Sequence, residues 1–234
     1  MKTMAMTAPL TAATRRGDKT QTRRLPDPRK VTKIYGIEDG IVTYGDKKNM
    51  TSKKVSIADF ISKFATYKTR EIVAIREPAV IESYSIDATG CKCTINYLYK
   101  GDEDYERRVP ETMELPERFF DEVRGVPTKW VQRHMGGVPN GCISEMMRTF
   151  VRIVDVRLEK LNDISTEDAI AEGVEVSNMK YGTYRDYSDR LNRCTAIESF
   201  ETLWDSINGY GSFDDRYVFV YVYAFVNKVD EVLA

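Results

Sequence analysis

The sequence predicts a mixed α+β fold, because β-rich stretches alternate with short amphipathic helices. The clearest strand is residues 217–226, where tyrosine or phenylalanine alternates with valine or alanine. Both faces of this strand are apolar, so we expect a closed barrel or a sheet packed under helices. Further strands are expected at 72–75, shortly before Pro78, and at 150–158.

Helices are expected where a capping residue precedes an apolar face. The first helix ends at Gly17, which allows the left-handed conformation. Others begin at Ser56 and at Ser165, and the latter runs to Gly173 with Ala169 and Ile170 inside. A further helix is expected at 116–124, before Gly125. The last begins with the capping box Thr195-x-x-Glu198. Its apolar face comprises Ile197, Phe200, Leu203, Trp204 and Ile207.

Composition restricts the possible functions. His134 is the only histidine, which removes multi-histidine metal sites and triads that need a second imidazole. The four cysteines show no CxxC spacing, so we expect neither a disulfide framework nor a four-ligand zinc site. We also expect no other metal and no cofactor. No apolar run reaches the roughly 18 residues of a membrane span, and no signal-peptide core follows Met1. We therefore expect a cytoplasmic protein without a membrane partner.

The most informative segment is the polar run Gly17-Asp18-Lys19-Thr20-Gln21-Thr22-Arg23-Arg24. It directly follows a helix, so the end of that helix restricts where its hydroxyl groups and cations can lie. Residues 15–33 contain eight Lys or Arg against two acids, although the net charge of the chain is only −1. This contrast argues against a protein that coats nucleic acid through bulk charge, but it permits a local basic cleft.

The order of several motifs gives the chain a family resemblance. The polar run is followed by Ile75-Arg76-Glu77-Pro78, by the element 164–174 and by the closing strand. In this order the chain resembles the ASCH-domain family of the PUA-like superfamily. Its length and the segment Leu203-Trp204-Asp205-Ser206-Ile207-Asn208-Gly209 are similar to ASCH proteins carried by bacteriophages and prophages.

The resemblance implies a single domain over residues 1–234, built as a PUA-like β-barrel with flanking helices. Segments near 26–49, 83–109 and 175–193 are expected to be insertions into it. The resemblance also implies a cleft that receives RNA, another nucleic acid or a modified nucleoside. Thr20, Arg23, Arg24, Arg76 and Glu77 are its expected ligand-binding residues.

One branch of the family hydrolyses the acetyl amide of acetylcytidine, and its catalytic lysine, threonine and glutamate fall on Lys19, Thr22 and Glu172. In that mechanism Thr22 attacks the amide and Lys19 removes its proton, since a desolvated lysine near other cations has a lowered pKa. Glu172 lies at the negative end of its helix, where a partner such as Lys19 offsets an unfavourable interaction of about 0.3–1 kcal/mol.

Several alternatives remain open from the sequence. The same cleft can bind RNA without catalysis, with arginines on phosphates and hydroxyls on base edges. A phage-encoded protein can instead bind a host factor through its insertions. The polar run can be a solvated turn, and Arg76 and Glu77 an ordinary ion pair at a strand end. The aromatic residues of the last strand can stack on bases or fill the core. The sequence does not define the oligomeric state.

Overall fold

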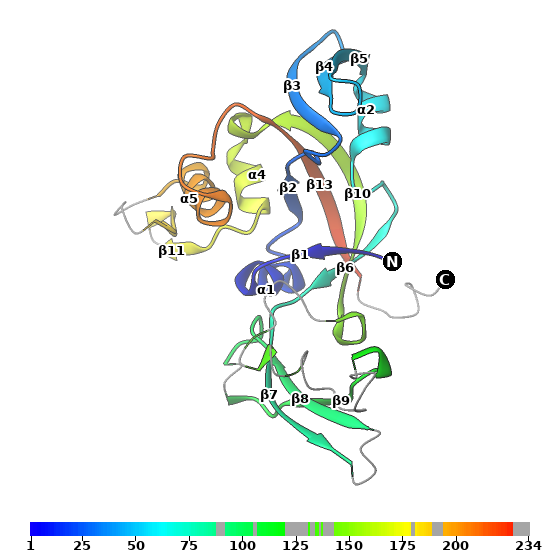
Figure 1. Cartoon of the computed structure of the whole chain (residues 1–234). Coiled ribbons are helices and arrows are strands. Elements are labelled where there is room, and N and C mark those ends of the chain that lie inside the picture. The colour runs from blue at the N-terminus through cyan, green and yellow to red at the C-terminus, as the bar shows by residue number, and fades with distance from the viewer. Residues whose placement is uncertain are drawn as a thin grey trace. The chain divides into compact units, whose positions relative to one another are not determined.

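The computed structural model describes residues 1–87, 92–104, 107–119, 131, 134, 135, 137, 143–178, 181–188 and 194–226. Within these residues the fold is α+β and consists mostly of strands, as predicted (Figure 1). The chain divides into two compact units, residues 1–13 with 74–150 and residues 14–73 with 151–234. Among the described residues, no helix combines the length and the apolar character that crossing a membrane requires.

Five strands form the largest sheet, in the order β1-β6-β10-β13-β2. β1 and β2 are the edge strands of this sheet and do not pair with each other, so the described strands do not show the predicted closed barrel. The predicted strands at 72–75, 150–158 and 217–226 are confirmed as β6, β10 and β13. The five strands are β1 (Lys2–Ala5), β2 (Gln21–Arg24), β6 (Ile72–Arg76), β10 (Thr149–Lys160) and β13 (Tyr217–Val226).

The strand β13 is part of the core. Phe219, Tyr221 and Tyr223 are at most 3% exposed. These rings therefore fill the interior and are not available to stack on bases. Tyr221 packs edge-on against Tyr67, with ring centroids 5.0 Å apart.

Four of the predicted helices are confirmed, and most of the helix expected at 116–124 lies outside the described residues. Gly17 follows the first helix with a φ of 84°, and Gly173 follows α4 with a φ of 85°. Ser56, Ser165 and Thr195 cap the other three, and Thr195 forms the predicted capping box with Glu198. The helices are α1 (Ala8–Arg16), α2 (Ile57–Phe64), α4 (Thr166–Ala171) and α5 (Ala196–Asn208).

In the unit that contains residues 14–73, a separate sheet has the order β3-β4-β5. Its strands are β3 (Val31–Glu38), β4 (Ile41–Asp46) and β5 (Thr51–Ser56). Figure 1 shows α2 beside this sheet, and Tyr44 of β4 lies 5.1 Å from the ring of Phe60. Phe60 in turn stacks on Phe219 of β13 at 5.9 Å. The expected insertion at 26–49 thus folds as a sheet together with β5.

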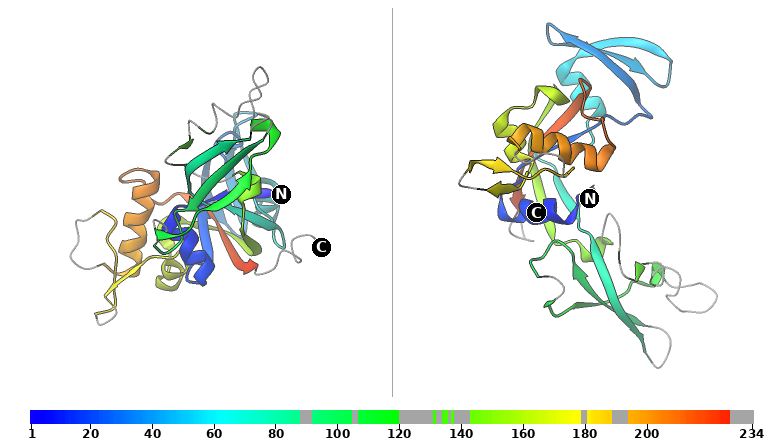
Figure 2. Two further views of the ribbon diagram at one scale, coloured as in Figure 1. Left: turned by 90° about the horizontal axis from the view of Figure 1, so that it is seen from below. Right: turned by 90° about the vertical axis from the view of Figure 1, so that its left-hand side faces the viewer.

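The same unit contains α4 and α5, which pack side by side (Figure 2). Between them the chain forms the short antiparallel pair β11 (Val176–Asn178) and β12 (Thr183–Tyr184), inside the expected insertion at 175–193. Phe200 and Trp204 of α5 are buried as predicted. Two expectations were wrong, because Ile170 is 40% and Ile207 is 50% exposed.

The unit that contains residues 74–150 has a sheet of order β7-β8-β9. These strands are β7 (Ala79–Ile86), β8 (Cys93–Tyr99) and β9 (Glu111–Glu114). Its core includes Ile81, Ile95, Leu115 and Met146, all at most 2% exposed. The expected insertion at 83–109 begins in the middle of β7. Short 3₁₀ turns occur at Glu117–Phe119 and Ser144–Met146, and a third, Leu161–Asp163, follows β10.

Candidate functional site

Lys19 lies between α1 and β2 and is 2% exposed. Its amine donates three hydrogen bonds, to Gln21 O at 2.8 Å, to Glu172 O at 2.6 Å and to Glu172 Oε2 at 2.9 Å. The expected pairing of Lys19 with Glu172 is therefore confirmed. An ammonium group has three N–H donors, so all of them are satisfied inside the protein.

Gly173 makes room for this lysine at the end of α4. A Cβ atom on Gly173 would lie 2.8 Å from Lys19 Cβ, closer than two such atoms can approach. The φ of 85° at Gly173 also belongs to the left-handed region that glycine tolerates best. The glycine that ends the helix thus also allows the lysine stem to pack against it.

Arg23 extends the same network from β2 and is 3% exposed. Its guanidinium donates to Glu172 Oε1 at 3.0 Å, to Asp168 Oδ2 at 2.8 Å and to Glu159 Oε2 at 3.3 Å. The guanidinium carbon also lies 5.7 Å from the ring centre of Phe200 in α5. Arg23 therefore joins β2 to α4, α5 and the end of β10.

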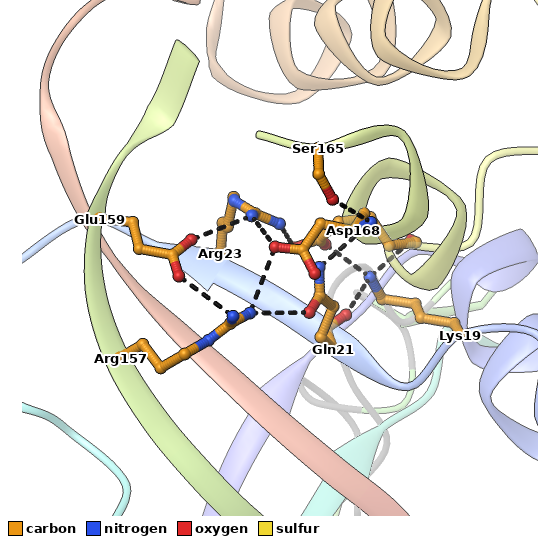
Figure 3. Close-up of polar contacts among 8 residues, drawn as sticks. Lys19, Gln21, Arg23, Arg157, Glu159, Ser165 and Asp168 are labelled. Carbon is orange, nitrogen blue, oxygen red and sulfur yellow. Dashed lines mark hydrogen bonds and ion pairs between the residues drawn. The ribbon is translucent and has the colours of Figure 1, made fainter. Parts of the chain in front are cut away.

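Arg157 of β10 closes the network (Figure 3). It lies 3.2 Å from Asp168 Oδ2 and 3.2 Å from Glu159 Oε1. Figure 3 shows Glu159 and Asp168 between the two arginines. Three cations, Lys19, Arg23 and Arg157, thus face three carboxylates, Glu159, Asp168 and Glu172. We call these six residues the buried ion network after Lys19, Arg23 and Glu172, whose side chains are at most 4% exposed. The side chains of Glu159, Asp168 and Arg157 are partly exposed, at 29%, 23% and 38%.

The chemistry of Lys19 follows from its burial. Removal from water lowers the pKa of its amine, and the nearby Arg24 and Arg23 act in the same direction. The charge of Glu172 and its hydrogen bond raise that pKa again, which partly offsets the desolvation. The amine is thus closer to a general base than an exposed lysine is, but its three acceptors favour the protonated form.

Thr22 does not join this network. In β2, side chains alternate between the two faces, so Thr22 points away from the face of Gln21 and Arg23. Thr22 pairs with Tyr221 in the sheet, and paired residues share a face. Among the described residues, no hydrogen bond joins Thr22 to Lys19 or Glu172. The structure therefore brings together two of the three expected catalytic residues and leaves Thr22 on the opposite face of the strand.

The expected ligand-binding residues on the same segment have different surroundings. Thr20 is exposed, and its backbone N–H donates to Ala171 O at 2.9 Å. Arg24 is half-buried and pairs with Phe219, which places it on the face of Thr22. The buried Arg23 already has three carboxylate partners. The solvated-turn interpretation was wrong for Gln21–Arg24, because these residues form a largely buried strand.

Arg76 and Glu77 belong to the other unit. Glu77 is fully buried and accepts hydrogen bonds from the Thr149 hydroxyl and, at 3.2 Å, from Arg148 Nη2. Arg148 also pairs with Asp102 at 2.5 Å and stacks 3.5 Å above the centre of Tyr99. Arg148 and Thr149 thus neutralise and bind the buried Glu77 within this unit. Arg76 is half-buried at the end of β6.

Sequence reasoning missed four members of the site: Gln21, Arg157, Glu159 and Asp168. Gln21 donates to Asp168 O at 2.8 Å, and the other three are ion-pair partners of Arg23 or of one another. Alternation in β10 offered a weak signal, since Arg157 and Glu159 are charged positions two residues apart on one face of a strand.

A second group of cations has a different environment. Residues 26–71 contain ten Lys or Arg and six acids. Arg29 and Lys53 pair with Asp27 and Asp46, and Lys68 donates to carbonyl groups of α2. Within the described part of the chain, the others form no ion pair. These seven exposed cations are Lys30, Lys33, Lys47, Lys48, Lys54, Lys63 and Arg70. We call them the basic surface.

We find no group of three or more Cys, His, Asp or Glu arranged to hold a metal among the residues that the structure describes. Cys93 and Cys194 are buried free thiols, and burial raises the pKa of both. The other two cysteines, Cys91 and Cys142, lie outside the described residues.

We compared the chain with protein-family models, with curated proteins and with solved structures. No family model, curated protein or solved structure matches it.

Proposed function

We propose that this chain is a non-catalytic module that binds single-stranded RNA through the basic surface on β3, β5, α2 and the loops beside them. The observation that carries the proposal is that, among the described residues, the cations of the basic surface have no ion-pair partners, whereas those of the buried ion network do. Seven exposed cations on residues 30–70 have no ion-pair partner in the described structure, whereas Lys19 and Arg23 are surrounded by carboxylates. Lysines that bind phosphates displace the counterions condensed on the nucleic acid, and this release supplies most of the non-specific affinity.

The geometry of the β4–β5 turn supports this proposal. Lys47 and Lys48 follow β4, and Met50 between the strands is 78% exposed. Lys54 pairs with Thr43 in the sheet, so it stands on the face opposite to the buried Tyr44. Cations thus occupy both the turn and the outer face of the sheet, which suits a flexible phosphate backbone.

Membership of the ASCH family and a PUA-like barrel are part of the same proposal. They are supported by the Lys19–Glu172 pair, which the resemblance implied and which joins the segment after α1 to the end of α4. In this account the buried ion network holds β2 against α4, and the residues around it position the RNA-binding sheet. The expected insertion at 26–49 then contributes most of the binding surface.

The test is the salt dependence of RNA binding. A fluorescein-labelled single-stranded RNA of eight nucleotides is titrated with protein at several salt concentrations. The double variant Lys48→Met/Lys54→Met should bind more weakly, and the slope of log K against log salt should fall by about 1.4, since each lost phosphate contact removes about 0.7. The matched double variant Lys100→Met/Arg107→Met changes the net charge equally in the other unit and should leave the slope unchanged. Equal effects of the two double variants would contradict the proposal.

A second candidate, acetylcytidine amidohydrolase, is favoured by one observation. Lys19 and Glu172 pair at 2.9 Å, and burial lowers the pKa of the Lys19 amine. The test is release of acetate from acetylcytidine, with Lys19→Met as the inactive control and Thr22→Val as the variant without a nucleophile. Turnover that survives Thr22→Val but is lost in Lys19→Met, with circular dichroism showing that Lys19→Met is folded, assigns Lys19 to the activation of water. The absence of turnover by the wild type rejects the candidate.

A further inference from the structure

A groove with a volume of about 660 Å³ runs along β3. It is lined by residues 31–38 of β3, by the segment after β2 that includes Pro28, by Lys160 and by Asp214–Tyr217 at the beginning of β13. All of these residues belong to the unit of residues 14–73 and 151–234. The volume lies in the range of about 300–1,000 Å³ that is typical of small-molecule sites.

The position of Tyr35 at this groove depends on Gly45, which has no side chain. Tyr35 is 59% exposed, so its ring is open to solvent. A Cβ atom on Gly45 would lie 3.2 Å from the Tyr35 hydroxyl and 2.2 Å from Thr32 Oγ1. The absence of that atom lets Thr32 bond to Gly45 O at 3.1 Å and lets the Tyr35 side chain extend over β4. The ring is therefore positioned and accessible.

The charges around the groove are mixed. Lys33 and Lys160 line it, and within the described part of the structure neither lies within ion-pair distance of an acid, although the charge of Lys33 helps to lower the pKa of Asp214. Arg216 is already paired with Asp214 at 2.5 Å, so it contributes little free charge. Glu38 and Asp215 line the groove as acceptors. A ligand for this site should combine a flat ring, an anionic group and hydrogen-bond donors.

We propose that this groove binds one nucleotide of a single-stranded RNA, with its base on Tyr35 and its phosphate near Lys33 and Lys160. The proposal rests on the proposed RNA binding and assigns it a specific nucleotide site beside the basic surface. Single-stranded RNA is commonly bound in this way, by aromatic side chains that stack on unpaired bases and cations that follow the backbone.

An extended peptide is a poorer occupant of the same groove. β3 is an edge strand, and edge strands can accept a further strand. However, its pairing with β4 shifts register between Val31 and Ile34 and again between Ile34 and Gly36. Such irregularities twist an edge away from regular pairing, so they disfavour strand addition.

The test uses two probes, the labelled eight-nucleotide RNA in an anisotropy titration and adenosine monophosphate in calorimetry. Tyr35→Ala removes the stacking ring and should weaken RNA binding about 5-fold or more. Its matched control is Tyr181→Ala, since Tyr181 is also 59% exposed but does not line the groove. Gly36→Trp should block the groove, because a Cβ on Gly36 meets no atom within 4 Å and the backbone needs no left-handed conformation there.

The outcomes separate this inference from the proposed function. Loss of RNA and adenosine monophosphate binding in Gly36→Trp, with Tyr181→Ala unchanged, supports the nucleotide site. RNA binding that is unchanged in both Tyr35→Ala and Gly36→Trp overturns the site but leaves RNA binding by the basic surface intact. Binding of adenosine monophosphate alone, lost in Gly36→Trp, supports the site and rejects the proposed RNA binding. No binding of either probe by the wild type overturns both.

Discussion

The buried ion network and the basic surface contain the same residue types but use them differently. Lys19 and Arg23 are at most 3% exposed and contact carboxylates from α4 and β10. Lys47, Lys48 and Lys54 are exposed and have no such partners in the described structure. The cations of the buried ion network can stabilise the fold, but their charge is already neutralised and is not available to a ligand. The cations of the basic surface contribute little to the fold, and their charge is available to a ligand.

This difference shows why a cluster of cations in a sequence does not by itself identify a binding site. Residues 15–33 have the strongest local basic excess, yet two of their cations are neutralised by residues about 140 positions away, as in the pair of Arg23 and Asp168. Burial decides the outcome, because a charge removed from water must find a partner.

The largest expected effect concerns the buried partner of Glu172. Lys19→Met leaves the Glu172 carboxylate, which is 4% exposed, with one cation fewer, and should lower the free energy of unfolding by about 3–5 kcal/mol. Arg16→Met removes the exposed pair with Asp18 and should cost at most about 1 kcal/mol. Urea denaturation of the three proteins measures both. Equal, small losses would show that the network does not stabilise the fold.

The next effect isolates the contact between Gly173 and Lys19. Gly173→Ala combines a left-handed backbone with a clash at 2.8 Å, whereas Gly17→Ala has nearly the same φ and no atom within 4 Å. Both should be destabilising by about 1–2 kcal/mol from the backbone alone, and Gly173→Ala by about 1–3 kcal/mol more from overpacking. Urea denaturation compares them, and equal losses would mean that Lys19 moves aside freely.

The smallest effect concerns an exposed capping charge and its pH dependence. Hydrogen bonds from the Thr195 N–H and hydroxyl hold the pKa of Glu198 below its usual value of 4.5. The ionised carboxylate therefore stabilises the folded chain above about pH 4.5, and this contribution is lost as the pH falls through the lower folded pKa. Glu198→Gln should cost about 0.3–1 kcal/mol at pH 7, and this cost should shrink as the pH falls through the lowered folded pKa, by urea denaturation. A pH-independent difference would contradict this assignment.

Local features of the fold were predictable from the sequence. The capping box at Thr195, the glycine ends at Gly17 and Gly173 and the strand 217–226 depend on residues close in sequence. Ile170 was placed wrongly because α4 has only six residues and too few turns to define a buried face. Ile207 lies in the last turn of α5, where the apolar pattern continues beyond the packed part of the helix.

The candidate site was predictable only in part. The pairing of Lys19 with Glu172 followed from the family resemblance and from the helix dipole. The position of Thr22 required the knowledge that residues 21–24 form a strand, since only then does alternation place it opposite Arg23. Spacing gave only a weak signal for Glu159 and none for Asp168, because tertiary packing brings both to Arg23.

Amine labelling with an acetylating reagent, read by mass spectrometry, tests the central claim most directly. The labelling of each lysine is compared in the free protein and in the presence of the eight-nucleotide RNA. Lys19 should remain unmodified in both, because its amine is buried and makes three hydrogen bonds. Lys33, Lys47, Lys48 and Lys54 should be labelled in the free protein and protected by RNA, while Lys100 is labelled in both. Labelling of Lys19 in the free protein that RNA suppresses, with no protection of Lys47, Lys48 and Lys54, would contradict the account.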